Sequence, residues 1–402
     1  MKSKKKEKKE HIVSLKLLYT ALIVLLYLMG RKIPLFYIDT AAYQSMAVEE
    51  SLLLQMIGGD AYRYSVFALG VSPYISASIL VQVYSNYRKK SHKGALDVGK
   101  TNRLTVGLCL FFTVWQAVVH VRKLIFVPAD GRKSWIYAIA VLEMIAGVMV
   151  VLWLSARNKQ YGIGGRTMLI YVNIVDGMLN TLKKQEWSGL AIPLMVSVVV
   201  VFVMLIMENT QVRLPLQRIS IYSLNKDKDY LPLKLNPIGV MPVIYSSAIF
   251  SLFGMLAGGL AQLFPKQSFC IWLSENVVQY RPLGIGLYLG IICVLTMLLS
   301  GVFLNLDEVT EQLLKNGDSI LDVYAGEDTK KYLTGKLRRL SVFSALVMCA
   351  CVGGPLILQC MGKMNESLSM FPVSVMMMVG IWNQLHQEVD SLRCLEKYHM
   401  FI

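Results

Sequence analysis

Residues 67–84 read FALGVSPYISASILVQVY, an apolar stretch with Gly70 and Pro73 near its start. Proline removes a backbone N–H and clashes with the preceding helical turn, so a helix is interrupted at this point. Inside a membrane, such an interruption is tolerated only where the freed backbone groups are buried in protein or face water. The stretch therefore predicts a membrane segment that lines a cavity.

The composition of the chain is that of a membrane protein with several spans. The chain has 402 residues, of which 55% are hydrophobic, and its mean hydropathy is +0.50. A soluble domain carries more polar residues than this. A membrane-spanning helix needs about 17 to 25 mostly apolar residues. Ten stretches meet this expectation, roughly residues 15–30, 71–87, 104–121, 135–155, 167–180, 189–208, 238–264, 283–305, 340–361 and 370–387. The second, fifth and tenth are the least apolar.

The distribution of charge predicts how the spans are oriented. The sequence starts with MKSKKKEKKEH, and the apolar run that follows has no small-residue cleavage site, so we interpret it as a retained first span. With this basic end in the cytoplasm, ten spans place most lysines and arginines in cytoplasmic segments, as the positive-inside rule expects. The loop with Arg122, Lys123, Arg132 and Lys133 is an exception. The net charge of +15 is therefore mostly topological, with both termini cytoplasmic, and does not indicate nucleic-acid binding.

The sequence lacks the motifs of catalysis, metal binding and cofactor binding. The seven cysteines are scattered, without a CxxC pair or a histidine at ligand spacing. There is also no glycine-rich nucleotide loop, no HExxH and no GxSxG pattern. The sequence therefore predicts no enzyme, no metal site and no cofactor, and we interpret the cysteines as small apolar packing residues.

Two cytoplasmic loops are long and charged, whereas the other connections are mostly short. The first, residues 209–237, alternates apolar and polar residues on either side of a polar NKDKD tip, which is a hairpin-like pattern. The second, residues 306–338, has apolar residues at helical spacing that stop at Asn316–Gly317. Long loops in compact proteins usually carry function. We interpret both as docking surfaces; the alternative is that they are solvated linkers.

Several blocks of the sequence, in order, resemble segments of the SecY family of protein-translocation channels. They are GRKIPLFYID (30–39), IGGDAYRYSVFALGVSPYISASI (57–79), YGIGGRTMLIY (161–171), VRLPLQ (212–217), LPLKLNPIGVMPVIYSS (231–247), LNLDEVTEQLLKNG (304–317) and GEDTKKYLTGKLRRLS (326–341). The blocks from VRLPLQ to VIYSS are the strongest match, because they resemble the family's RRIPVQ to IPLKVNxAGVIPVIFASS pattern. We do not expect so many blocks to occur in the same order by chance.

The resemblance implies an all-α polytopic membrane protein of ten helices, arranged as two inverted five-helix halves that open like a clamshell. Inverted repeats of this kind recur among membrane transporters. The implied parts are a basic cytoplasmic N-terminus, an N-terminal half, a C-terminal half and a cytoplasmic tail, at residues 1–14, 15–187, 188–387 and 388–402. The implied location is the bacterial plasma membrane.

In this family a ring of aliphatic side chains seals the waist of an hourglass-shaped pore. The positions that match the ring are Val71, Ile75, Ile170 (or Leu169), Ile244 and Met376. Apolar side chains can close around a moving polypeptide and exclude ions by dewetting. Any one of these residues could equally be an ordinary packing or lipid-facing residue.

The resemblance also implies a short plug helix at the outer mouth of the pore, which matches residues 51–66. The candidate plug residues are Met56, Gly58, Gly59, Tyr62 and Tyr64. The segment is too polar after Met56 to span a membrane, and the glycine pair gives the hinge freedom that a displaceable stopper needs. The alternative is a loop that caps the outer face.

A lateral gate toward lipid is expected between the second and seventh spans. The candidate gate residues are Ile79, Gln82, Val83, Ser246, Ser247 and Phe250. The apolar core of a signal peptide could insert between these spans. Gln82 is costly in an apolar helix unless it is paired, so it could equally form an interhelical hydrogen bond without a role in transport.

The sequence departs from the family in the second cytoplasmic loop. The family has an arginine and a proline there, in an I-R-P-G segment used in coupling to the motor ATPase SecA, whereas this chain has Tyr324 and Ala325. A phenol cannot reproduce the bidentate contacts of a guanidinium. The GIGNG segment is likewise replaced by Gly162–Arg166. The departures resemble those of the accessory SecY paralogue of certain Gram-positive bacteria. Candidate motor contacts are Arg213, Arg218, Lys226, Lys228, Lys234, Tyr324, Glu327, Asp328, Lys330 and Lys331.

The resemblance implies a pore subunit that passes unfolded preprotein across the membrane. Its implied partners are the lipid bilayer, a SecA-type motor, in particular the accessory SecA, and small accessory or SecE/SecG-like subunits. The implied substrate is a serine-rich glycosylated adhesin. One alternative is a divergent housekeeping SecY. A secondary transporter of a small solute is another, although only Glu143 and Asp176 are clearly intramembrane acids that could bind a solute or ion. A purely structural membrane scaffold is a third.

Overall fold

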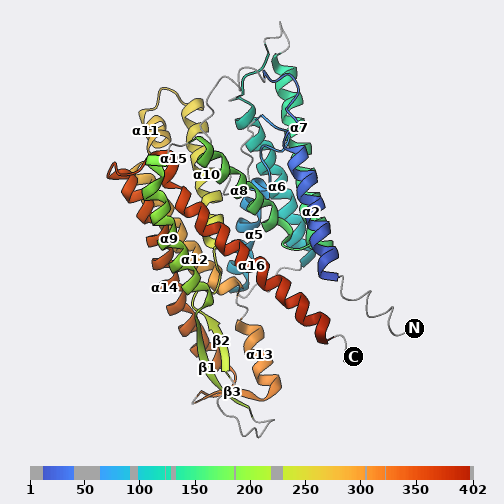
Figure 1. The fold of residues 1–402 in the computed structure, drawn as a ribbon, viewed down its shortest axis with the longest axis vertical. Helices are drawn as coiled ribbons and strands as arrows, with labels where there is room; N and C mark the ends of the chain where they lie inside the picture. The colour runs from blue at the N-terminus through green and yellow to red at the C-terminus, as the bar shows by residue number, and fades with distance from the viewer. Residues whose placement is uncertain are drawn as a thin grey trace, which may run out of the picture.

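The computed structural model describes residues 12–39, 64–90, 98–122, 124–127, 133–184, 187–218, 230–303, 306–321 and 323–398. Their helices form two neighbouring groups, with α16 crossing between them and a small sheet at the end where both termini lie (Figure 1). The all-α fold class is therefore confirmed for the membrane part of the chain.

The first group contains five long helices. They are α2 (Ile12–Gly30), α5 (Ser72–Lys90), α6 (Val98–Val121), α7 (Lys133–Tyr161) and α8 (Gly165–Lys184). The interruption expected at Gly70 and Pro73 is the start of α5. Gly70 has a φ of +51° in the turns that precede the helix, and Pro73 lies in the first turn, where a missing N–H costs nothing.

The second group begins at α9 and ends with α16. Its helices are α9 (Trp187–Asn209), α10 (Met241–Leu263), α11 (Ser268–Asn276), α12 (Pro282–Phe303), α13 (Leu306–Asn316), α14 (Glu327–Cys360), α15 (Glu366–Ser369) and α16 (Phe371–Tyr398). Two of them are longer than expected. α14 starts 13 residues before the span expected from residue 340, and α16 continues through most of the segment expected as a tail.

A helix is found at each of the ten expected spans, but only seven are long and apolar enough to cross a membrane by composition: α2, α6, α7, α9, α10, α12 and α14. The other three, α5, α8 and α16, are the stretches that the sequence marks as least apolar. α8 contains Asn173, Asp176 and Asn180, and the second half of α16 is charged. The count of ten spans therefore stays a prediction.

The two long loops form one small structure. The hairpin-like pattern of the first loop is confirmed by β1 (Gln211–Arg218) and β2 (Tyr230–Lys234), which pair antiparallel with Gln211 opposite Lys234. The sequence did not indicate the third strand, β3 (Asp318–Ile320), which follows α13 in the second loop and pairs with the far edge of β1. Leu214, Leu233, Leu313, Ile320 and Leu333 form its apolar core. The predicted helix of the second loop is α13, and it ends before Gly317, whose φ is +71°.

Candidate functional site

The candidate ring residues are buried and come from elements of both helix groups. Val71 comes just before α5, Ile75 from α5, Leu169 and Ile170 from α8, Ile244 from α10 and Met376 from α16. All six are at most 4% exposed, and all belong to one buried apolar cluster; we call these six residues the ring cluster. α5 contacts α10, and α8 contacts α16. Each of these two contacts joins a helix of the first group to a helix of the second group.

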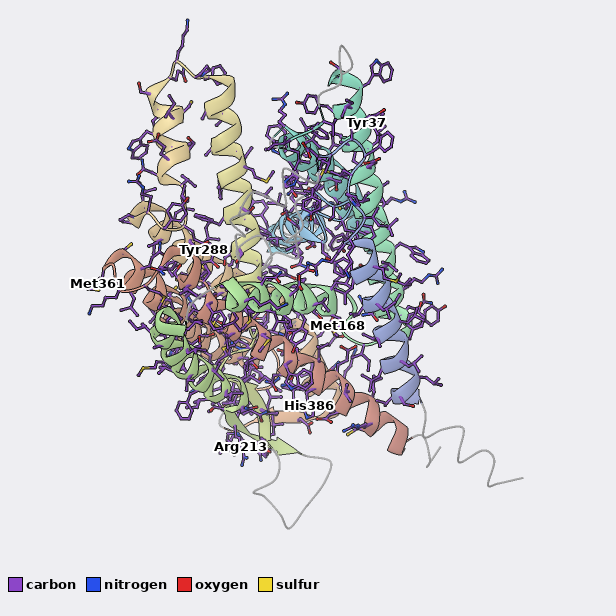
Figure 2. The ribbon with its side chains drawn as sticks, turned by 45° about the horizontal axis from the view of Figure 1, so that its top comes forward. Tyr37, Met168, Arg213, Tyr288, Met361 and His386 are labelled. Carbon is purple, nitrogen blue, oxygen red and sulfur yellow. The ribbon has the colours of Figure 1, made fainter. Side chains whose placement is uncertain are left out.

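The candidate gate residues lie at the contact between α5 and α10, with one difference from the expected pairing. The side chain of Gln82 in α5 lies beside the side chain of Tyr245 in α10. Ser247 bonds instead to Tyr288 of α12, with 2.8 Å between the hydroxyl oxygens. Figure 2 labels Tyr288, and the Ser246 hydroxyl donates instead to the carbonyl of Val243 at 2.9 Å. Ser247 therefore holds α10 against α12, and Tyr245 is the polar residue of α10 that faces Gln82.

The other candidate gate residues are apolar neighbours of this contact. Ile79 is fully buried and Phe250 is nearly so, while Val83 packs against the same cluster. The Phe250 ring meets the Tyr288 ring edge-on at a centroid distance of 5.5 Å. Gln82 therefore faces Tyr245 across the contact between α5 and α10, while its Oε1 has no hydrogen-bond partner among the described residues.

The corner between α7 and α8, residues Gly162–Arg166, is held by polar side chains that the sequence did not single out. The amide of Asn158 donates to the carbonyls of Ile163 and Gly165, each at 3.0 Å. The hydroxyl of Thr20 in α2 accepts from the N–H of Ile163 at 2.8 Å. Gly164 and Gly165 have φ values of +75° and +46°, which a side chain rarely adopts.

Arg166 and Gly164 connect this corner to neighbouring helices. The Arg166 guanidinium carbon lies 3.9 Å from the centre of the Tyr74 ring in α5, a cation–π contact. The N–H of Gly164 donates to the Glu388 carboxylate of α16 at 3.1 Å. A Cβ at Gly164 would lie 2.3 Å from a methyl group of Leu385. The corner is therefore packed tightly against α16.

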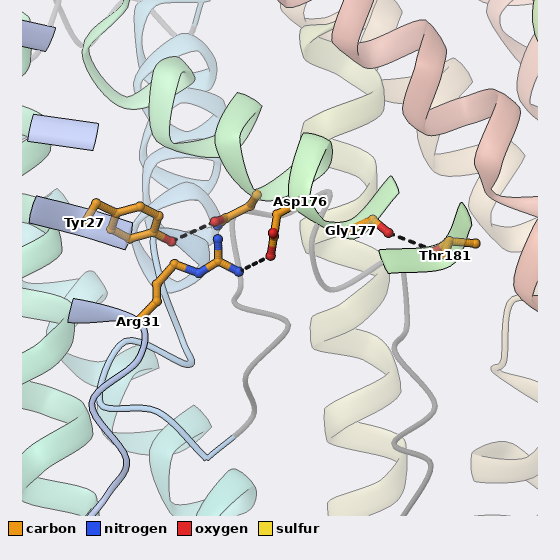
Figure 3. Close-up of polar contacts among 6 residues, drawn as sticks. Tyr27, Arg31, Asp176, Gly177 and Thr181 are labelled. Carbon is orange, nitrogen blue, oxygen red and sulfur yellow. Dashed lines mark hydrogen bonds and ion pairs between the residues drawn. The ribbon is translucent and has the colours of Figure 1, made fainter. Parts of the chain in front are cut away.

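Both intramembrane acids expected from the sequence have local partners. Arg31, which is 2% exposed, donates to Asp176 at 2.9 Å, and the Tyr27 hydroxyl donates to Asn173 at 3.0 Å. Figure 3 shows how these pairs join α2 to α8. Glu143 accepts the backbone N–H of Phe36 at 2.9 Å. These acids therefore have structural partners, which weakens the support for a solute site.

Most of the candidate plug lies outside the described residues. Met56, Gly58, Gly59 and Tyr62 fall in that part of the chain, and only Tyr64 is described. The carbonyl of Tyr64 accepts the N–H of Leu35 at 2.9 Å, and Ser65 forms a β-bridge with Pro34. The entry to α5 is thus tied to the segment that follows α2.

The candidate motor contacts fall on the small sheet and on the start of α14. Arg213 lies over the Tyr230 ring at 4.7 Å, and Figure 2 labels it at the sheet end of the molecule. Lys330 pairs with Asp307 of α13 at 2.7 Å, and Tyr324 is 85% exposed. Glu327, Asp328 and Lys331 are also exposed. Lys226, Lys228 and the side chain of Arg218 lie outside the described residues.

Known proteins of similar sequence are named as protein translocase subunits. The "Accessory Sec system protein translocase subunit SecY2" of Streptococcus pneumoniae (strain CGSP14) is 27% identical, and the match covers 96% of this chain and 97% of that protein. The protein of the same name from Leuconostoc gelidum subsp. gasicomitatum is 26% identical, with 96% of both chains covered. The "Protein translocase subunit SecY" of Mycoplasma capricolum is 28% identical, over 85% of this chain and 78% of that protein.

Solved structures with the same fold are protein-conducting channels. The fold matches that in "The structure of a protein conducting channel" with a TM-score of 0.71 and 16% identity, over 96% of this chain and 93% of that one. It matches "Sec61 in the Canine ribosome-channel complex from the endoplasmic reticulum" with a TM-score of 0.64, 16% identity and the same coverage. The SecY family model matches residues 65–386. The chain is therefore a member of the SecY family of protein-translocation channels, and relatives that match it end to end are accessory Sec subunits.

Proposed function

We propose that this chain is the pore subunit of an accessory protein-export system in a bacterial plasma membrane. In this proposal a cytosolic SecA-type motor, in particular an accessory SecA, drives unfolded preprotein through the ring cluster, and a serine-rich glycosylated adhesin is the substrate. Small accessory or SecE/SecG-like subunits complete the translocon. The end of the molecule with both termini and the sheet faces the cytoplasm.

The observation that carries the proposal is the ring cluster. Its six apolar side chains belong to one buried apolar cluster to which both helix groups contribute: Val71 comes just before α5, Ile75 from α5, two from α8 and one each from α10 and α16. An apolar constriction without fixed polar ligands accepts a polypeptide of any sequence and still opposes the passage of hydrated ions. The end-to-end similarity to accessory relatives supports the choice of export system.

The decisive experiment is deletion of the gene, followed by surface proteomics of the mutant strain. The general secretome and any serine-rich surface glycoprotein are measured side by side, with a complemented strain as the control. A viable strain that retains only the glycoprotein inside the cell is the expected result. Lethality or a broad loss of secretion would instead identify a housekeeping channel, an alternative favoured by the 28% identity to the Mycoplasma capricolum subunit.

A further inference from the structure

A small polar pocket lies where α9, α16 and the segment after β2 meet. Its volume is about 210 Å³, and its lining residues are Glu208, Lys234, Asn236, Pro237, Ile238, Gly239, Asn383, Gln384 and Gln387. Pockets for drug-sized ligands usually exceed about 300 Å³. The pocket is therefore of a size for one side chain or one small ion.

The acid in this pocket, Glu208, has one carboxylate oxygen without a hydrogen-bond partner. Glu208 is 6% exposed. Its Oε2 accepts the side-chain N–H of Asn383 at 2.5 Å, whereas its Oε1 has no partner among the described residues. Leaving a buried acceptor without a donor costs about 1–3 kcal/mol, and more for a charged group. A ligand that donates a hydrogen bond to Oε1 would remove this cost.

The described groups around Glu208 leave its Oε1 without a donor. Lys234 is near enough to act on Glu208 electrostatically, but its ammonium bonds Gln387 Oε1 at 2.7 Å at the exposed rim. The Lys234 ammonium is therefore engaged at the rim and does not bond Glu208 Oε1. Gly380 of α16 is also close to Glu208: a Cβ there would meet the Val240 side chain first and would lie 3.1 Å from Glu208 Oε1.

The geometry of the pocket fits three possible cations unequally: an arginine guanidinium, a divalent metal ion and a lysine ammonium. An arginine binds a carboxylate best through two parallel hydrogen bonds to both oxygens, but Asn383 already occupies one oxygen of Glu208. A divalent metal needs several anionic ligands, and the described residues contain no cluster of three acidic, histidine or cysteine side chains. An ammonium needs only one charged acceptor and neighbouring amide oxygens. The lysine ammonium fits best.

We propose that this pocket binds the lysine side chain of a partner polypeptide, with its ammonium donating to Glu208 Oε1. The exposed rim at Gln387 admits the side chain from the sheet end of the molecule. That this end faces the cytosol rests on the proposed function, whereas the pocket and its chemistry do not depend on it.

The test uses carbodiimide coupling in native membranes that contain the complete export machinery. The reagent activates a carboxylate, and an amine in direct contact displaces the activating group to form an amide. The chain carries Lys234→Arg, so that its own nearest amine cannot react. We expect mass spectrometry to find Glu208 joined to one lysine of a different polypeptide. Changing that lysine to methionine should abolish the product and weaken retention of the partner on the purified channel several-fold.

Two variants control the coupling. Glu208→Gln should lose the product because the amide is not activated, and Glu275→Gln, an exposed acid of α11, should keep it. If Glu208→Gln fails to fold, the result with Lys234→Arg decides alone. The proposal is overturned if Glu208 couples only to lysines of its own chain, or if no Glu208 product forms. Neither outcome depends on which proteins the system exports, so a failed proposed function remains distinguishable.

Discussion

At the scale of the residue, two features can be tested by substitution: the apolar side chains of the ring cluster and the buried polar pairs near it. Ile75 is 4% exposed within the cluster, while Leu80, five residues later on the same helix, is 44% exposed. The same substitution at both positions therefore shows whether an effect comes from loss of the pore seal or only from adding a polar group to α5.

Ile75→Asn should raise ion conductance through the resting channel. An amide at the constriction holds water, and an apolar gate excludes ions only while it stays dry. Conductance across a planar bilayer that contains the purified channel measures the effect. Leu80→Asn should leave the conductance at the wild-type level. Equal conductance for wild type and Ile75→Asn would remove Ile75 from the seal.

The pair of Arg31 and Asp176 should respond unequally to loss of either charge. Asp176 is about one-third exposed, whereas Arg31 is buried. Asp176→Asn removes the negative partner of a buried guanidinium, which is left with an unpaired charge away from water. Arg31→Met removes the partner of Asp176, but water can reach and solvate that carboxylate. We expect the first change to cost on the order of 2 kcal/mol, and the second to cost less. Thermal unfolding in nanodiscs compares them; the reverse order would contradict this account.

At the scale of the element, the small sheet joins two loops that are about a hundred residues apart in the sequence. Hairpin and helix periodicity predicted β1, β2 and α13, because each depends on local pattern. β3 has only three residues, too few for a periodicity, and its pairing depends on a distant strand. Similarly, Asn158 could not be predicted from sequence, because its two acceptors are backbone carbonyls of the Gly162–Arg166 corner.

Ile320→Asp should separate β3 from β1. The side chain is 3% exposed in the apolar core of the sheet, where an unpaired charge is strongly unfavourable. Limited proteolysis should cut the second loop several-fold faster than in the wild type. The adjacent Leu321 is 51% exposed, so Leu321→Asp should leave the cleavage rate unchanged. Similar rates for both variants would show that β3 does not hold the loop.

Asn158→Ala should destabilise the corner between α7 and α8. Two buried carbonyls lose their donor, at a cost of about 1–3 kcal/mol each. The free energy of unfolding, measured by denaturant titration in detergent micelles, should fall accordingly. Gln160→Ala, at an exposed position two residues later, is the matched control. If both variants unfold alike, the corner does not depend on Asn158.

At the scale of the whole molecule, ten helical stretches were predictable because a membrane demands long apolar runs, whereas the two halves and the ring positions were expected only from the resemblance to the SecY family. The reasoning from apolar runs is weakest for α5, α8 and α16. These helices, with the turn just before α5, provide five of the six residues of the ring cluster and contact other helices instead of lipid alone. Their lower hydropathy follows from that position, so the segments with the weakest membrane signal are those that build the candidate site.

The motor preference of the whole channel should change when the second loop is altered. Tyr324 is 85% exposed at the turn before α14, so a Tyr324→Arg, Ala325→Pro double variant should bind a housekeeping SecA several-fold more tightly and the accessory motor less. Binding of each purified motor to the channel in nanodiscs measures the shift. Leu321→Arg, at another exposed position nearby, controls for added charge. Unchanged binding of both motors would discard the idea.

The crossing of α16 between the two helix groups has a consequence for biosynthesis. The ring cluster draws Val71 and Ile75 from early in the chain and Met376 from late in it, and α16 then reaches α8 and α2. During translation, α5, α8 and α10 are made long before the ribosome reaches residue 376. A nascent chain therefore lacks part of the ring cluster until synthesis is nearly finished, and a premature stop codon anywhere before residue 376 yields a product without Met376.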